Sequence, residues 1–387
     1  MKHILKIGIC ILSFLFIINS LSAQLNEKAE VSILTCGPGF EFFESFGHTA
    51  LRVRDTSQGI DYVFNWGVFD FSTDNFYLKF AQGRLPYMLG VTTYEGFIAG
   101  YARDGRSVYE QILDLTYDEK QILYDSVVKN SYPENRYYYY DFFEDNCATR
   151  IRDIVQYSLQ NRKFPVEAVT DTNLGFRELF YPYEDNFLWW RFGIDIVLGA
   201  RSDRKASTYD YMYLPKDLMD QFDTTILVND TKGLVKSKRT VLEELYQHSY
   251  PTVFSPDLLF WILFVLIALL SFLEWKKGFY AKAFDIVLFS VITILSLLVF
   301  YMAFISDHNA TKGNLNLLWA NPLFLWVLIR LQKTNRIVLY VLLGCLSILI
   351  LGFWPLPQLF NTAFIPVWLI LALRLTLLLL RKNGSFK

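Results

Sequence analysis

The chain has 387 residues, of which 53% are hydrophobic, and its formal net charge is -1. This charge balance gives no electrostatic reason to expect a nucleic-acid partner. The mean hydropathy of +0.24 is high for a soluble protein, and the apolar residues gather at the extreme N-terminus and after Asp257. The sequence therefore predicts a large soluble part followed by a membrane part.

The N-terminus has the three parts of a secretory signal peptide. Lys2 and Lys6 provide a basic start, residues 7–18 form a short apolar region, and the Ser-Leu-Ser-Ala stretch at 20–23 supplies small residues of the kind found at cleavage sites. We expect residues 1–23 to be removed by cleavage before Gln24. The alternative is an uncleaved anchor, but the apolar run is shorter than the roughly 20 residues that a membrane span needs.

Strand and turn signals follow in residues 24–165. Residues 31–35 predict a short strand, which ends at the Cys-Gly-Pro-Gly turn of residues 36–39. Residues 48–54 and 61–66 alternate in polarity around a turn at 55–59, and this pattern predicts a β-hairpin. Residues 117–128 have a helical pattern, whereas the aromatic run 137–143 fits a strand or a loop.

A helix with a strong start signal is expected at residues 147–156. Asn146 precedes it as an N-cap and places Cys147 in its first turn. Residues 166–256 are less legible and are expected to be a membrane-proximal extension of the soluble part. The aromatic segment 187–192 within them suits the bilayer surface and a protein core equally well.

Five apolar stretches predict a transmembrane domain over residues 257–387. Trp275 and Trp319 flank the shorter stretches as expected interfacial groups, and the stretches lie at 258–273, 284–304, 317–330, 337–354 and 363–380. Lysine and arginine cluster at 276–282, 330–336 and 381–382, which five alternating spans place on one side of the membrane. The positive-inside rule makes that side the cytoplasm and places residues 24–256 outside, as a cleaved signal peptide would. We therefore expect a multi-pass inner-membrane protein with a periplasmic domain.

Few residues can carry chemistry. The sequence has no phosphate-binding P-loop, dinucleotide fingerprint or HExxH zinc motif, and the histidines and cysteines of the expected mature chain are His48, His248, His308, Cys36, Cys147 and Cys345. Sites built from several cysteines and histidines are therefore nearly excluded, and we expect neither a metal nor a cofactor.

Cys147 and His48 are the candidate catalytic pair. A thiol in the first turn of a helix feels the positive end of the helix dipole and free backbone N–H groups, which favour the nucleophilic thiolate and can bind an oxyanion. His48 opens a predicted strand and suits the role of the base. Asn65 on the returning strand is the expected third group that orients the imidazole, with Asp61 as the alternative. Two structural interpretations of Cys147 stay open: a buried inert thiol, or a disulfide with Cys36.

The loop between the second and third apolar stretches, residues 305–316, is rich in polar groups. The predicted topology places it on the same side as Cys147. His308 and Asn316 are the expected substrate-binding residues there, because imidazole and amide groups suit a phosphate or an amide ligand. The alternative is a solvated connector.

Residue order and several motifs carry a family resemblance. A histidine on a strand that precedes an Asn-Cys pair at a helix start looks like the permuted papain-like fold of lecithin:retinol acyltransferase-type enzymes. More closely, the chain resembles the Lnb family of bacterial lipoprotein N-acyltransferases in the segments LTCGPGFEFFESFGHTALRVRD, DYVFNWGVFDF, DNCATRIRD, FGIDIVLGARSDRKAS and SDHNATKGNLNLLWANPL. The resemblance implies an α+β fold, with a permuted papain-like thiol-enzyme domain at 24–165 and an all-α bundle of five transmembrane helices at 257–387. It implies His48 and Cys147 as the catalytic pair and leaves Asn65 open.

The function implied by this resemblance is acyl transfer through a Cys147 thioester. The donor would be a membrane phospholipid or a diacylglyceryl lipoprotein, and the acceptor the α-amino group of a lipidated N-terminal cysteine. Two alternatives are a membrane-tethered thiol peptidase or amidase acting on the cell wall, and a non-enzymatic envelope assembly protein. A tethered peptidase needs only one anchor span, so five spans argue against it.

Overall fold

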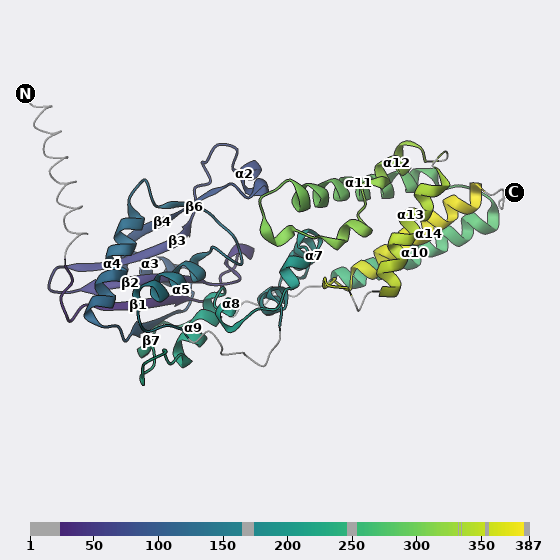
Figure 1. The fold of residues 1–387 in the computed structure, drawn as a ribbon. Helices are drawn as coiled ribbons and strands as arrows, with labels where there is room; N and C mark the ends of the chain where they lie inside the picture. Colours follow the sequence, from purple (N-terminus) through teal and green to yellow (C-terminus); the bar gives the residue numbers. More distant parts are fainter. Residues whose placement is uncertain are drawn as a thin grey trace, which may run out of the picture. The chain divides into compact units, whose positions relative to one another are not determined.

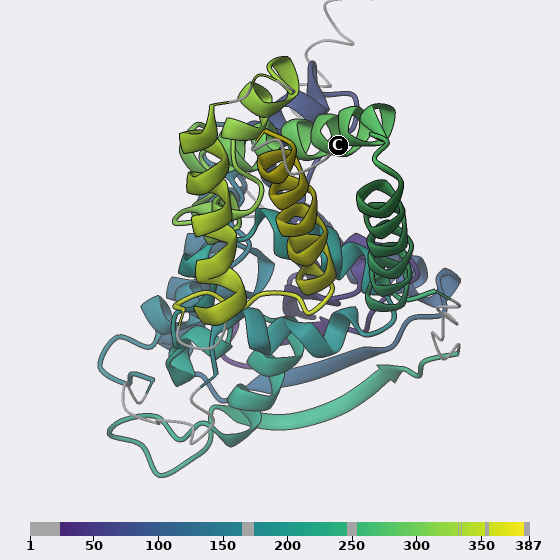
Figure 2. The same cartoon turned by 90° about the vertical axis from the view of Figure 1, so that its right-hand side faces the viewer.

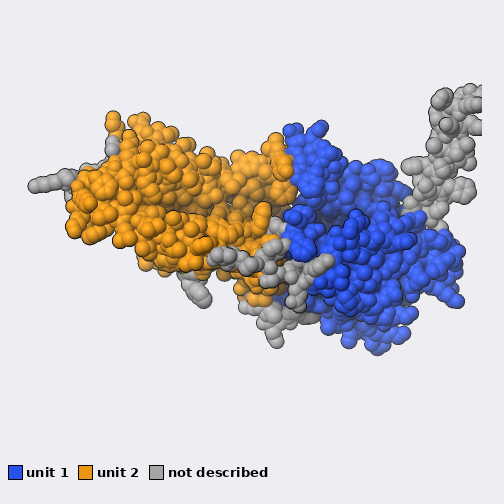
Figure 3. Space-filling view, turned by 180° about the vertical axis from the view of Figure 1, so that it is seen from behind, with its two compact units in different colours: residues 1–76, 85–172, 207–248 blue, residues 77–84, 173–206, 249–387 orange. Residues whose placement is uncertain are grey.

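The structure is a computed structural model that describes residues 24–164, 174–245, 254–331, 333, 335–352 and 356–382. The predicted signal peptide, residues 1–23, lies outside these described residues, as does His248. The chain forms two compact units (Figure 3). The sheet unit comprises residues 1–76, 85–172 and 207–248, and the helical unit comprises residues 77–84, 173–206 and 249–387. Both units thus combine segments that are distant in the sequence.

The sheet unit is built on seven strands in the order β6-β4-β3-β2-β1-β5-β7, and every neighbouring pair is antiparallel (Figure 1). The strands are β1 (Glu30–Cys36), β2 (His48–Asp55), β3 (Ile60–Val68), β4 (Pro86–Thr93), β5 (Val108–Leu113), β6 (Tyr137–Tyr139) and β7 (Val235–Leu242). The first strand and the hairpin of the sequence prediction are confirmed, because β2 pairs with β3 and β1 pairs with β2.

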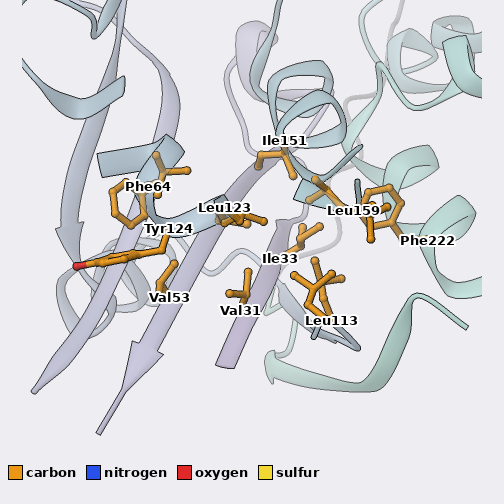
Figure 4. Close-up of a cluster of buried hydrophobic side chains, with 14 of the residues drawn as sticks. Val31, Ile33, Val53, Phe64, Leu113, Leu123, Tyr124, Ile151, Leu159 and Phe222 are labelled. Carbon is orange, nitrogen blue, oxygen red and sulfur yellow. The ribbon is translucent and has the colours of Figure 1, made fainter. Parts of the chain in front are cut away.

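Alternating side chains divide the core of the sheet unit between the two faces of the sheet. Helices α4 (Tyr117–Ser131), α5 (Cys147–Ser158) and α9 (Pro215–Thr224) contribute to the larger apolar cluster on one face. Figure 4 shows Val31 and Ile33 of β1 beside Leu123 of α4 and Ile151 of α5. Leu34 of β1 and Ala50 of β2 point to the opposite face of the sheet. There they form a smaller apolar cluster with helix α3 (Tyr94–Arg103). The predicted helices at 117–128 and 147–156 are therefore confirmed as α4 and α5.

Among the described residues, three helices are long and apolar enough to cross a membrane. They are α10 (Pro256–Lys277), α11 (Lys282–Phe304) and α14 (Phe364–Lys382). Helix α13 (Arg336–Gly352) is apolar but has only 17 residues. Figure 2 shows α14 between α10 and α13, in agreement with its contacts to both. The chain is thus an α+β protein with a sheet unit and a helical membrane unit.

The third predicted span is much shorter than the sequence suggested. Within residues 317–330 the α-helix α12 covers only Leu323–Ile329. Pro322 precedes it, and a proline lacks the N–H that would continue a helix through this point. Trp319, expected at the membrane interface, is 1% exposed and belongs to the core of the helical unit. Each of the five predicted stretches contains a helix, but they differ widely in length.

A buried ionic cluster joins three of the membrane helices. The guanidinium of Arg374 in α14 contacts Asp285 of α11 at 2.7 Å and Glu274 of α10 at 3.0 Å. It also donates to the Ser271 hydroxyl at 3.0 Å. Charges inside a bilayer are costly unless they are paired. These contacts therefore fix the three helices relative to one another.

Candidate active site

Cys147 lies at the start of helix α5, and Asn146 caps this helix. The Asn146 side-chain oxygen accepts from the backbone N–H groups of Ala148 and Thr149 at 2.8 and 3.0 Å. Its side-chain N–H₂ group donates to the carbonyl oxygens of Phe142 and Tyr213 at 2.7 and 2.9 Å. The cap therefore satisfies the helix terminus and also fixes the position of Cys147 in the sheet unit.

The cap uses two of the backbone N–H groups in the first turn of the helix. The sequence suggested that free N–H groups of the first turn would bind an oxyanion. Two of them, from Ala148 and Thr149, already donate to Asn146. The Ala148 N–H group also stabilises the thiolate of Cys147, so the helix terminus acts on this thiol through a backbone N–H group as well as through its dipole.

His48, the first residue of β2, lies against both Cys147 and Asn65. Its Nε2 donates to the side-chain oxygen of Asn65 at 2.5 Å, and it also forms a hydrogen bond with Cys147. Use of Nε2 toward Asn65 leaves the other ring nitrogen for proton exchange with the thiol. All three side chains are half-buried. The structure thus brings together the three residues that the sequence singled out.

The electrostatics of this group favour an ion pair. Burial opposes the thiolate of Cys147. The charge of His48 and its hydrogen bond outweigh that effect, with help from the N–H groups of Thr49 and Ala148, so the pKa of Cys147 lies below its ordinary 9.0. Burial also opposes the imidazolium, but Cys147 and Asn65 together raise the pKa of His48 above its ordinary 6.5. A lowered thiol pKa beside a raised imidazole pKa is the arrangement that activates a cysteine nucleophile.

The neighbouring Cys36 has the properties of an inert thiol. It pairs with His48 across the β1–β2 ladder and is 1% exposed. Burial raises the pKa of Cys36 to about 12, so the thiolate is scarcely populated at neutral pH. Cys36 and Cys147 are both free cysteines in the structure. The structure therefore contains no disulfide between them.

Asp61, the alternative orienting residue, is committed elsewhere. Its carboxylate accepts two hydrogen bonds from Arg52, at 2.7 and 2.8 Å. It pairs with Arg54 near the far end of the β2–β3 hairpin, whereas His48 begins β2. Strand register therefore selects Asn65 rather than Asp61 as the partner of His48.

Other residues around Cys147 were not predicted. Gly67 has a φ of +96°, and a Cβ built on it would lie 3.9 Å from the imidazole and 4.0 Å from the Cys147 Cβ. Tyr87 stacks on Tyr140 at 4.7 Å between ring centroids, and Tyr140 is close enough to Cys147 for their charges to interact. The segment DYVFNWGVFDF contains Gly67, but a single glycine carries no signal of its role. The tyrosines were hidden in an aromatic run that suits many uses.

Two family models match the chain. Residues 21–174 match the Lnb N-terminal periplasmic domain, and residues 248–384 match the Lnb transmembrane domain. The chain belongs to the Lnb family. It is therefore a membrane protein with a periplasmic domain. No match was found among curated proteins or among solved structures.

The transmembrane domain of this Lnb chain gives Asn316 a structural use. The side chain is fully buried, and its N–H₂ group donates to the carbonyl oxygens of Asp195 and Ile196 at 2.8 and 3.0 Å. Its oxygen accepts from the indole N–H of Trp319 at 2.8 Å. Contrary to the sequence-based expectation, the amide of Asn316 has no exposed group for a substrate, because it caps the end of α7 (Leu188–Val197).

The same packing explains two of the motifs that carried the family resemblance. In the helical unit, residues 196–200 of one motif lie directly against residues 310–314 of the other. Gly199 donates to the carbonyl of Ala310 at 2.9 Å, and a Cβ at Gly199 would lie only 2.1 Å from the Lys312 carbonyl oxygen. The Asn314 side chain donates to the carbonyl oxygens of Ile196 and Val197. Much of the polar loop is therefore used to pack against α7.

His308, the other expected substrate-binding residue, is also engaged. Its Nε2 donates to the backbone carbonyl oxygen of Phe80 at 2.8 Å. Phe80 belongs to helix α2 (Phe76–Gln82), and its ring lies edge-on to the imidazole. His308 is half-buried, and its observed partner is a segment of the same chain.

Asn65 acts through His48 and is expected to be a positioning residue. In this Lnb chain, Asn65→Ala should lower turnover by about 10²-fold, because the imidazole loses the contact that orients it. Loss of this hydrogen bond also lowers the pKa of His48, so the basic limb of the pH–rate profile should move to lower pH. Asn65→Asp, which retains an acceptor oxygen, should recover part of the activity. An unchanged pH profile in Asn65→Ala would contradict this role.

Proposed function

We propose that this protein is a lipoprotein N-acyltransferase of the inner membrane. The observation that carries the proposal is the Cys147–His48–Asn65 group at a capped helix terminus, in a chain that also has the Lnb transmembrane domain. The family matches support the membrane and periplasmic setting. The geometry supports thiol chemistry in the sheet unit.

The first half-reaction forms a thioester. The Cys147 thiolate attacks an ester carbonyl of a phospholipid or of a diacylglyceryl lipoprotein. The ester C–O bond breaks, and the departing alkoxide takes the proton of the His48 imidazolium. The acyl chain then remains on the Cys147 sulfur. The lowered pKa of Cys147 favours this step, because the attacking group is already ionised.

The second half-reaction transfers the acyl chain to nitrogen. The neutral α-amino group of a lipidated N-terminal cysteine attacks the thioester carbonyl, and neutral His48 accepts a proton from it. The C–S bond breaks, which restores the thiolate–imidazolium pair. The net change exchanges an ester for an amide and releases an alcohol.

The membrane unit suits substrates of this kind. Both donor and acceptor carry acyl chains that reside in a bilayer. Extraction of such a chain into water costs about 0.8 kcal/mol for each CH₂ group. An enzyme with helices long enough to cross a membrane can receive these chains without exposing them to solvent.

The test is mass spectrometry of lipoprotein N-termini from cells with and without the gene. We expect N-acylated termini in the presence of the gene and free α-amino groups in its absence. Complementation with wild type should restore the mass of one acyl chain, whereas complementation with Cys147→Ala should not. Identical N-termini in the two strains would refute the proposal, and altered cell-wall peptides would support the peptidase alternative instead.

A further inference from the structure

The connection between β3 and β4 contains an exposed apolar helix. Helix α2 (Phe76–Gln82) has no buried residue. Tyr77 is 82% exposed, Leu78 56% and Phe80 52%. A cluster of large exposed apolar side chains on one short helix is unusual for a surface that faces water.

Three interactions and one close approach hold residues 77–84 against the 305–316 loop of the same helical unit. The Asp307 N–H donates to the Gln82 carbonyl at 2.8 Å, and His308 donates to the Phe80 carbonyl at 2.8 Å. Arg84 forms an ion pair with Asp307. Gly83 has a φ of +73°, and a Cβ there would lie 3.1 Å from the His308 nitrogen. Residues 77–84 are thus packed closely on the loop that contains Asp307.

That loop begins where a membrane-spanning helix ends. Helix α11 ends at Phe304, and Phe304 and Ile305 are 66% and 59% exposed. Because α11 is one of the three helices long enough to span the bilayer, its exposed end lies at the edge of the hydrocarbon layer. Asp307 follows almost at once, so the segment bonded to it lies at the level of the lipid headgroups. The apolar face of α2 therefore continues a lipid-facing surface.

We propose that the exposed face of α2 inserts into the lipid interface of the membrane leaflet on the side of the 305–316 loop. Tyr77, Leu78 and Phe80 would lie among the glycerol groups and upper acyl chains, where aromatic side chains are favoured. Lys79 supplies a basic group in the same segment, suited to lipid phosphates. The partner is thus the phospholipid bilayer itself.

Along the chain, α2 directly follows the strand that carries Asn65. The segment leaves the sheet after β3, which carries Asn65, and returns at β4. The insertion does not depend on the proposed acyl transfer. If the proposed acyl transfer also holds, α2 is the part of the β3–β4 connection that meets the donor lipid.

Spin labelling of the full-length protein in phospholipid nanodiscs tests the insertion. The background protein carries Cys36→Ala, Cys147→Ala and Cys345→Ala. Each labelled protein adds one cysteine that carries a nitroxide: Leu78→Cys in α2, Leu297→Cys in α11 or Ser237→Cys on the lysine-rich strand β7. We expect the ratio of oxygen to nickel-complex collision rates at residue 78 to exceed that at residue 237 by about tenfold, because polar solutes are excluded from apolar surroundings. Residue 297 serves as the hydrocarbon reference.

If α2 were surrounded by water or by a second copy of the chain, the collision rates would differ from this expectation. Equal ratios at residues 78 and 237 would mean that α2 lies in water, and would overturn the proposal. Low collision rates with both reagents, with spin–spin broadening, would mean that a second copy covers α2, and would also overturn it. A photoreactive phenylalanine derivative at residue 78 in the otherwise native protein gives an independent check, and crosslinks to phospholipid are expected. None of these readouts uses acyl transfer, so a failure of the proposed function would leave them unaffected.

Discussion

Replacement of Cys147 by alanine is expected to abolish acyl transfer while leaving the protein folded and inserted. Removal of a covalent nucleophile blocks the first step, so turnover should fall by about 10⁴-fold or more. The side chain is small and half-buried, and the cap on α5 is made by Asn146 rather than by Cys147. Steady-state assays of the purified variant in mixed micelles, with size-exclusion profiles as a check of folding, measure this loss.

Two other cysteines provide matched controls. Burial raises the pKa of Cys36, so this thiol stays protonated and is a poor nucleophile toward an ester. Cys345 lies within the apolar helix α13, outside the sheet unit that contains His48. Cys36→Ala and Cys345→Ala should both retain most of the activity. Near-wild-type turnover in purified Cys147→Ala would end the thioester mechanism. Loss of activity in Cys36→Ala, together with an oxidised Cys36–Cys147 pair in the active enzyme, would reassign both residues.

Local signals in the sequence predicted the parts of the site that depend on local structure. The Asn-Cys pair predicted a capped helix, and α5 begins at Cys147 with Asn146 as its cap. The alternating segments on either side of residues 55–59 predicted the β2–β3 hairpin. In a hairpin the turn fixes the register, so the approach of Asn65 to His48 was within reach of the sequence. The same register keeps Asp61 near the turn and away from His48. The two hydrogen bonds from Arg52 to the Asp61 carboxylate were not predicted, because nothing in the local pattern pairs these two side chains.

Long-range packing explains what the sequence did not predict. The polar side chains of loop 305–316 were predicted to bind substrate. In the structure, Asn314 and Asn316 instead donate hydrogen bonds to the end of α7, which lies more than 100 positions earlier in the chain. Helix α2 joins the helical unit through Asp307 and His308, although the sequence places it between two strands of the sheet. Such partners cannot be inferred from periodicity, which reports only on the neighbours of each residue along the chain.

Replacement of His48 by alanine should reduce turnover by about 10²- to 10⁴-fold and should also change the ionisation of Cys147. In wild type, the charge and hydrogen bond of His48 outweigh burial, so the pKa of Cys147 lies below 9.0 and the thiolate persists as the pH falls below that value. Without His48, burial dominates and the pKa of Cys147 should rise. The thiolate would then require a higher pH, because a raised thiol pKa favours the protonated form.

The rate of Cys147 alkylation by iodoacetamide as a function of pH measures this change directly, without an acyl substrate. The midpoint of the wild-type profile should lie below 9.0, and that of His48→Ala should lie above the wild-type value. His308→Ala is the matched control, since His308 belongs to the helical unit and donates to Phe80, and its profile should follow wild type. Coincident profiles for wild type and His48→Ala would show that the imidazole does not activate the thiol. The role of His48 would then be confined to proton transfer to the leaving alkoxide and from the attacking amine.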